Sequence, residues 1–192
     1  MRKLPKIYEN MFDNLLLDLA ENTTEIFKKL SFSPNDITTL SNISCLISVY
    51  FIFKRKFICS CIFFMLAYFF DCLDGHYARK YKMVSKFGDL YDHVSDIFKF
   101  SLILYSLYSI NDKTFFKILP VIIILLILSF THLGCQEIYY NKNESHSLNI
   151  TKSFCNCINT NGIEKTILFT KYFGTGTLFL FMTLIICFYN KL

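Results

Sequence analysis

The chain has 192 residues and is rich in apolar side chains but poor in charge. Hydrophobic residues make up 53% of it and charged residues 18%, and the mean hydropathy is +0.38. Soluble domains carry about 25% charged residues, and a domain of this size cannot bury so much apolar surface. The composition therefore excludes a soluble globular domain and predicts an integral membrane protein. The net charge of +5 comes from basic residues scattered beside apolar segments, so no nucleic-acid partner is expected.

Residues 7 to about 30 have the pattern of an amphipathic helix. Apolar positions recur every four residues and acidic positions lie on other faces: Ile7, Met11, Leu15 and Leu19 against Glu9, Asp13, Asp18 and Glu21. Such a helix is typical of the membrane interface, and a soluble helix packed on a partner is the alternative. We find no pattern of a cleavable signal peptide here. Residues 1–36 are expected to form an interfacial segment ahead of a transmembrane domain at 37–192.

Five apolar segments follow, each near the roughly 20 residues that one membrane crossing requires. They span 37–53, 57–78, 87–110, 114–133 and 166–189. Gly174 and Gly176 mark a weak point in the last segment, so six crossings are the alternative to five. The predicted fold is an all-α membrane bundle of five helices, or six, preceded by the interfacial helix.

The distribution of Lys and Arg predicts the orientation. With a cytoplasmic N-terminus, the cytoplasmic side carries most of these residues, and the opposite side carries only Lys54, Arg55, Lys56, Lys113, Lys117 and Lys191. Because positive residues are enriched in cytoplasmic loops, this orientation is favoured.

The informative stretch is DCLDGHYARKYKMVSKFGDLYDHVSD, residues 71–96, which places carboxylates at the ends of two apolar segments. Asp71 and Asp74 are three residues apart, and Asp92 and Asp96 are four apart, so each pair shares a helix face. A short basic loop joins the two segments, so both pairs lie near one membrane surface. Carboxylates inside a membrane indicate a functional site.

Four facing carboxylates remain ionised only if cations neutralise them. Mg²⁺ and Mn²⁺ take oxygen ligands and bring phosphate with them. Gly75 and Gly88 leave room for a bulky ligand or a close helix, and Arg79 suits a phosphate. Together these features predict phosphoryl transfer on a lipid-soluble substrate. A divalent-cation channel or transporter is an alternative, although Arg79 would repel its ion.

The pattern Asp71-x-x-Asp74-Gly75-x-x-Ala78-Arg79, followed after eight residues by Gly88-x-x-x-Asp92-x-x-x-Asp96, resembles the signature of the CDP-alcohol phosphotransferase family. The resemblance implies an active-site hairpin at 57–110 and two divalent ions, Mg²⁺ or Mn²⁺. It implies metal ligands at Asp71, Asp74, Asp92 and Asp96, and contacts to the CDP moiety at Gly75, Ala78, Arg79, Gly88, Asn35 and Thr38. Asn35, Thr38 and Asn42 share a helix face, and joining helices by hydrogen bonds is the alternative role for them.

The resemblance also implies the reaction. Asp96 would be the general base that deprotonates the acceptor hydroxyl, which attacks the phosphorus distal to cytidine and releases CMP. Asp92-His93 resembles the choline- and ethanolaminephosphotransferases, whose third Asp precedes a His, although Asp89 stands where that group has Glu. His93 is therefore a second catalytic candidate, with a helix-surface histidine bonded to a neighbour as the alternative.

Transfer from CDP-choline or CDP-ethanolamine to diacylglycerol is accordingly the favoured reaction. A CDP-diacylglycerol-dependent transferase acting on inositol, serine or glycerol phosphate is the alternative. The resemblance further implies a homodimer with a cytoplasmic active site, in an endoplasmic-reticulum-type membrane if the membrane is eukaryotic or host-derived. For Lys99, one turn beyond Asp96, we expect a charge-balancing role.

The eight cysteines are not expected to form a disulfide scaffold. Five of them lie in apolar stretches, where Cys acts as a small hydrophobe: Cys45, Cys59, Cys61, Cys72 and Cys187. A metal site is an alternative for the others, formed by Cys135, His146, Cys155 and Cys157, although this spacing is not a usual zinc pattern.

Overall fold

The computed structural model describes residues 2–140, 155 and 162–191, and all the regular secondary structure in these ranges is helical. The longer helices are α1 (Met11–Lys29), α2 (Pro34–Phe53), α3 (Phe57–Lys80), α4 (Lys86–Ile110) and α5 (Asp112–Tyr140), followed by α7 (Ile163–Thr170) and α8 (Thr175–Phe188). Short 3₁₀ turns, η2 (Lys171–Phe173) and η3 (Tyr189–Lys191), flank α8. The predicted all-α class is confirmed.

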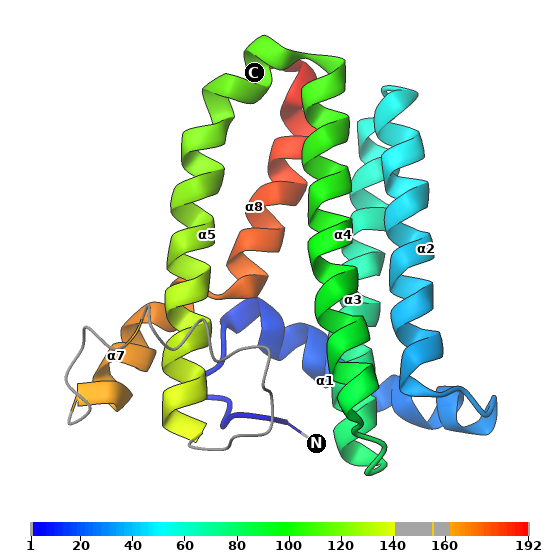
Figure 1. The fold of residues 1–192 in the computed structure, drawn as a ribbon, viewed down its shortest axis with the longest axis vertical. Helices are drawn as coiled ribbons and strands as arrows, with labels where there is room; N and C mark the ends of the chain where they lie inside the picture. The colour runs from blue at the N-terminus through cyan, green and yellow to red at the C-terminus, as the bar shows by residue number, and fades with distance from the viewer. Residues whose placement is uncertain (1, 141–154, 156–161, 192) are drawn as a thin grey trace.

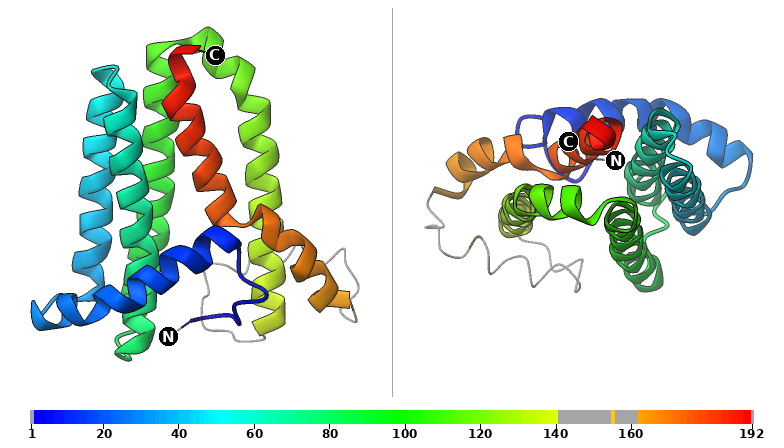
Figure 2. Two further views of the ribbon diagram at one scale, coloured as in Figure 1. Left: turned by 180° about the vertical axis from the view of Figure 1, so that it is seen from behind. Right: turned by 90° about the horizontal axis from the view of Figure 1, so that it is seen from above.

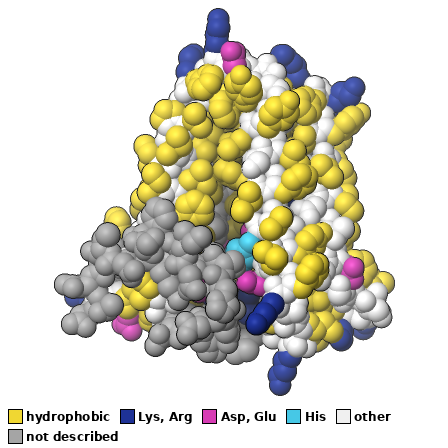
Figure 3. All heavy atoms as spheres, viewed as in Figure 1, with side chains coloured by type: hydrophobic (Ala, Val, Ile, Leu, Met, Phe, Trp, Pro, Cys, Tyr) yellow, Lys and Arg dark blue, Asp and Glu magenta, His cyan; other side chains and the backbone are white. Residues whose placement is uncertain are grey.

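Helices α2, α3, α4, α5 and α8 run alongside one another, while α1 lies across one end of the bundle (Figures 1 and 2). Four stretches are long and apolar enough to cross a membrane: 34–53, 57–80, 112–139 and 163–191. Figure 3 shows hydrophobic side chains over the flank of the bundle and basic side chains near its two ends. The protein is a multi-pass membrane protein. Helix α4, the third predicted span, has 25 residues and runs beside these helices, but it carries several charges in its first half.

The last predicted span is divided rather than continuous. Helix α7 ends at Thr170, and Gly174 adopts an extended backbone before α8 begins at Thr175. The break leaves the first N–H groups of α8 without a cap from its own N-cap residue. The weak point predicted at the glycines is therefore real.

Helix α1 supplies the missing cap. The Asp13 carboxylate accepts hydrogen bonds from the backbone N–H of Gly176 and the Thr175 hydroxyl, both at 3.2 Å, and from the Tyr68 hydroxyl. An added Cβ at Gly176 would lie 2.3 Å from Asp13 Oδ1, so only glycine permits this approach. Asn10 also donates to the carbonyl of Lys171 at 2.6 Å. The break in the bundle and the position of α1 thus depend on each other.

The predicted apolar face of α1 points away from the protein. Helix α1 begins four residues after the predicted start, so Ile7 precedes it. Ile7, Met11, Leu15 and Leu19 are exposed, as expected of a segment in a membrane interface, whereas Leu16 and Ala20 are buried against the bundle. Glu21 accepts hydrogen bonds from Lys80 and His76 of α3, and these bonds, that of Lys80 first, lower the pKa of Glu21 to about 2. Polar contacts therefore join α1 to the bundle.

Within the described part of the chain Cys135 and Cys155 form a disulfide, which the sequence pattern does not predict. Its formation removes two thiolates from the alternative metal site, whose other residues, His146 and Cys157, lie outside the described residues. The five cysteines expected to act as hydrophobes are free, and two of them, Cys45 and Cys61, are buried.

We predict that Asp13→Ala destabilises the protein. The change leaves the Tyr68 hydroxyl and the Gly176 N–H buried without an acceptor, at a cost of about 1–3 kcal/mol. For a chain of this size the unfolding midpoint falls by roughly 2–4 °C per kcal/mol. Since the chain has no Trp, unfolding in detergent is best followed by reaction of the buried thiols with a maleimide dye.

Asp18→Ala is the matched control on the same helix. Its exposed side chain pairs with Arg2 and Lys6 in contact with solvent, where an ion pair contributes about 0–1 kcal/mol. Equal midpoints for the two variants would show that Asp13 does not cap α8.

Candidate active site

The start of α2 positions the first polar residues of the site. Ser33 and Asp36 form a capping box, in which each side chain bonds the other's backbone N–H, and α2 therefore begins at Pro34, three residues before the predicted span. This start gives Asn35 and Thr38 helical positions that face the carboxylates. The Thr38 hydroxyl donates to Asp74 Oδ2 at 2.6 Å.

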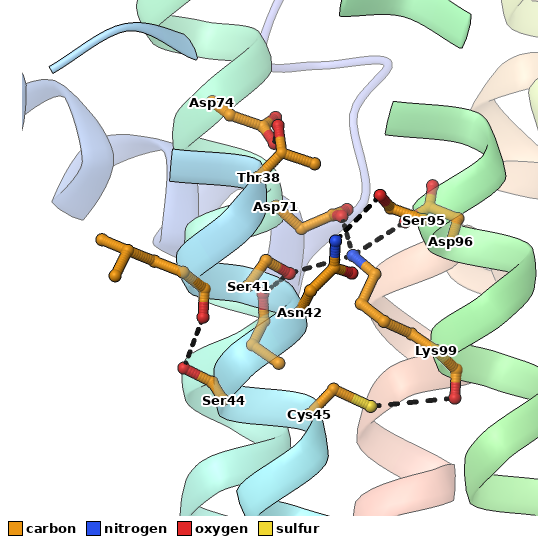
Figure 4. A network of polar contacts seen from close by, with 12 residues as sticks. Thr38, Ser41, Asn42, Ser44, Cys45, Asp71, Asp74, Ser95, Asp96 and Lys99 are labelled. Atoms are coloured by element: carbon orange, nitrogen blue, oxygen red, sulfur yellow. Dashed lines mark hydrogen bonds and ion pairs between the residues drawn. The ribbon is translucent and has the colours of Figure 1, made fainter. Parts of the chain in front are cut away.

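The predicted carboxylates of α3 and α4 meet beside α2. One carboxylate oxygen from each of Asp71, Asp74 and Asp92 lies within 4.8 Å of the others. Helix α2 packs against both α3 and α4, and the side chains of Asp71, Asp74 and Asp96 gather along it (Figure 4). The helical spacing brings each pair to one face, and the short turn between α3 and α4 brings the two faces together.

A cavity of about 190 Å³ opens on one side of the carboxylates. It is lined by every residue predicted to contact CDP, together with two of the metal-ligand candidates: Asn35, Thr38, Gly75, Ala78, Arg79, Gly88, Asp74 and Asp92. An added Cβ at Gly75 would lie 3.2 Å from Nη1 of Arg79, and one at Gly88 would lie 3.2 Å from Oδ1 of Asn35. The two glycines thus make room for the polar groups of this first cavity.

A second cavity, of about 230 Å³, lies on the other side of the same carboxylates. It shares Lys3, Asp74, Gly75, Arg79 and Asp92 with the first cavity, and Asp71 and Asp96 line it as well. Its remaining wall comes from Glu9, which precedes α1, and from α1, α3 and α8: Asp13, Leu17, Tyr68, Cys72, Thr175 and Phe179. The two cavities therefore adjoin at the carboxylates.

Two of the predicted polar residues make contacts between or within helices. Asn42 donates to Ser95 Oγ at 3.0 Å and so joins α2 to α4 (Figure 4). His93 Nδ1 lies 2.6 Å from the backbone carbonyl of Asp89, one turn earlier in α4. His93 lines neither cavity, so its catalytic role stays a prediction.

Lys99 lies below the carboxylates and is only 5% exposed. Its ammonium donates to Asp71 Oδ1 and to Ser41 Oγ, the latter at 2.9 Å, and lies 2.9 Å from Asp96 Oδ1 (Figure 4). The predicted charge-balancing contact with Asp96 is present, and the contact with Asp71 is additional.

Sequence reasoning missed the polar residues that the N-terminal segment and α5 bring to the site. Glu9 accepts a hydrogen bond from Gln136 at 3.2 Å, and Lys3 pairs with Glu137, which lines the first cavity. In the predicted helix from residue 7, Glu9 and Asp13 would be one turn apart on the polar face, which normally contacts water, whereas in the structure Glu9 precedes α1. That spacing was the available signal, but it did not show which surface the face would meet.

A model of the CDP-alcohol phosphatidyltransferase family matches residues 32–190. The chain belongs to this family. Members are transferases of substituted phosphate groups, so this CDP-alcohol phosphatidyltransferase is a membrane enzyme of phospholipid biosynthesis. No curated protein and no solved structure matches the chain significantly.

The residues at the centre of this CDP-alcohol phosphatidyltransferase suit a divalent metal ion. Three carboxylate oxygens converge within 4.8 Å, and hard divalent cations bind such oxygens. Oδ1 of Asp92 is buried and has no hydrogen-bond partner among the described residues. A buried carboxylate oxygen without a donor is costly unless a cation binds it.

We predict that Glu9 makes the stability of the protein depend on pH. Burial, and then the nearby charge of Asp13, raise the pKa of Glu9 from 4.5 to about 7. Because the folded state favours the neutral Glu9 carboxyl, the contribution of Glu9 to the stability of the fold is complete below pH 4.5 and is lost as pH rises through 7. In Glu9→Gln, whose side chain stays neutral, the unfolding midpoint should fall less between pH 5 and pH 8 than it does in the wild type. Each kcal/mol of pH-dependent stability that the variant no longer loses corresponds to roughly 2–4 °C in the midpoint.

Glu9→Asp is the control, because it keeps an ionisable carboxyl at this position. It should retain the fall in midpoint that Glu9→Gln reduces. Identical pH profiles for the wild type and Glu9→Gln would contradict the assignment.

Proposed function

We propose that the chain transfers a substituted phosphate from a CDP-linked donor to an alcohol, with release of CMP, at the carboxylates between the two cavities. The observation that carries this proposal is the convergence of Asp71, Asp74 and Asp92 where the two cavities adjoin. One cavity would receive the nucleotide donor, and the other the group that is transferred or that accepts it.

The first cavity suits the CDP part of the donor. Arg79 presents a guanidinium, which binds phosphate with two N–H donors, and Asn35 offers an amide on the opposite wall. Gly75 and Gly88 keep the space beside these groups open. This arrangement supports a diphosphate bound between Arg79 and the carboxylates.

Asp71, Asp74 and Asp92 would hold Mg²⁺ or Mn²⁺, and Asp96 would contribute to a second ion. When bound, the ions neutralise the diphosphate and help CMP to leave. Thr38 keeps one oxygen of Asp74 in place by its hydrogen bond, so the other oxygen is available to a ligand.

Asp96 is our candidate for the general base. Its side chain is partly exposed and lines the second cavity. There it would take the proton of the acceptor hydroxyl as the oxygen attacks the phosphorus distal to cytidine, and the bond to CMP breaks. His93, which lies outside both cavities, is a weaker candidate for this role.

The charge of the second cavity favours an aminoalcohol group. Beyond the shared carboxylates, the N-terminal segment adds Glu9 and Asp13, and the basic residues of the lining are Arg79, shared with the first cavity, and Lys3, which pairs with Glu137. Acidic residues outnumber basic ones in this lining, which favours choline or ethanolamine over an anionic acceptor such as glycerol phosphate, and the Tyr68 and Phe179 rings suit a quaternary ammonium. This supports CDP-choline or CDP-ethanolamine as donor and diacylglycerol as acceptor.

The orientation in the membrane is part of the proposal. The excess of Lys and Arg supports a cytoplasmic active site, in an endoplasmic-reticulum-type membrane if the membrane is eukaryotic or host-derived. The Cys135–Cys155 disulfide, whose Cys135 lies two residues before the cavity residue Glu137, is the observation against it, since disulfides are rare in reducing compartments. Residues 1–36 would act as an interfacial segment of the 37–192 domain, and the family resemblance supports a homodimer.

The test of function is CMP release by the protein purified in detergent with Mg²⁺ or Mn²⁺. We expect release with CDP-choline or CDP-ethanolamine and diacylglycerol, loss of release with EDTA, and recovery when the metal is restored. Release with CDP-diacylglycerol and inositol, serine or glycerol phosphate alone would establish the alternative reaction. Release with none of these pairs would overturn the proposal.

We predict that Asp96→Asn lowers kcat by about 10²- to 10⁴-fold, as expected for a lost general base. Donor binding, measured by calorimetry with CDP-choline, should change little. Asp112→Asn, an exposed carboxylate at the first position of α5 that lines neither cavity, is the control and should keep wild-type kcat. Near-normal turnover by Asp96→Asn would exclude Asp96 as the base.

A further inference from the structure

Lys99 is an unusual residue at the position it occupies. It lies in the apolar part of α4 and is almost fully buried, where a lysine is stable only if it is paired. Its ammonium has three N–H donors, and it has three oxygen partners, on Asp71, Asp96 and Ser41. The ammonium is therefore fixed in place rather than merely near the acidic residues.

Ser41, which lies on α2, also holds the Lys99 ammonium in place. Its hydroxyl donates to the backbone carbonyl of Ala67 at 2.8 Å and accepts from Lys99 at 2.9 Å. Ser41 is fully buried, so both of its hydrogen bonds are shielded from water. Figure 4 shows the Lys99 side chain extending from α4 to the Asp71 carboxylate, beside α2.

The four carboxylates thus divide into two unequal groups. Asp71, Asp74 and Asp92 each place one oxygen within 4.8 Å of the others, whereas Lys99 contacts Asp96 and one oxygen of Asp71. With Lys99 and one divalent ion, the four carboxylates keep one net negative charge. With Lys99 and two divalent ions, the positive charge exceeds theirs by one.

We propose that the Lys99 ammonium occupies the place of a second cation, so that a second divalent ion binds only in competition with it. The first ion binds at Asp71, Asp74 and Asp92 without displacing Lys99. The second needs Asp96 and the oxygen of Asp71 that Lys99 holds. Lys99 is thus a positioning residue that sets the metal requirement of the enzyme, an inference that rests on the metal site of the proposed function.

The test is a titration of the purified, metal-free chain with Mn²⁺, in which bound Mn²⁺ is measured by calorimetry and by the paramagnetic resonance signal of free Mn²⁺. The wild type should bind one ion at least ten-fold more tightly than the second. In Lys99→Met the second ion should bind at least ten-fold more tightly than in the wild type, with the first changed little.

Three further variants complete the experiment. Lys99→Arg keeps the charge and should retain the wild-type difference between the two ions. Lys117→Met removes an exposed lysine of α5 that lines neither cavity and should leave both affinities unchanged. Ser41→Ala removes one partner of the ammonium and should strengthen binding of the second ion by about three-fold. Ser41→Ala carries the test if Lys99→Met does not fold.

The outcomes separate this inference from the proposed function. Two ions bound with the same affinities in the wild type, Lys99→Met and Ser41→Ala would overturn the role of Lys99 and leave the metal site intact. No bound Mn²⁺ in any variant would overturn the metal site itself.

Discussion

An ionised carboxylate inside an apolar helix is stable only beside a cation or a hydrogen-bond donor, and Asp71, Asp74, Asp92 and Asp96 impose this requirement on the three helices around them. Thr38 of α2 donates to Asp74, and Lys99 of α4 binds Asp71 of α3. Each carboxylate that is satisfied in this way ties two helices together. The same interactions that stabilise the charge therefore also set the relative positions of α2, α3 and α4, and the two cavities form on either side of them.

The N-terminal helix is held in place by a second set of polar groups that require hydrogen-bond partners. Because Gly174 interrupts the last span, the N–H groups of α8 require an acceptor, and Asp13 provides it. Helix α1 must then turn the side that carries Asp13, Leu16 and Ala20 toward the bundle, which leaves Met11, Leu15 and Leu19 exposed. The acidic wall of the second cavity is a consequence of this orientation, so one helix both completes the fold and forms part of the candidate site.

The helices and the centre of the site follow from local spacing, and so they could be predicted. Residues three or four apart share a helix face wherever the helix lies, which is why Asp71 and Asp74 meet Asp92 across a short turn. The contacts of Glu9, Lys3 and Glu137 join segments distant in the sequence, and the Cys135–Cys155 disulfide joins residues 20 apart. No local period encodes such pairs. The acidic face of α1 has the same pattern whether it meets water or protein.

The two cavities differ in their acidic lining, and under the proposed function this difference would orient a substrate that spans them. Arg79 lies at the first cavity and at the boundary, close to where a diphosphate would bind, whereas Glu9 and Asp13 lie only in the second. A donor with an anionic diphosphate at one end and a cationic alcohol at the other matches this polarity in one direction only. In that direction the phosphorus distal to cytidine lies at the carboxylates, next to Asp96. The uneven placement of charge along an otherwise apolar chain would thus select both the substrate and the bond that reacts.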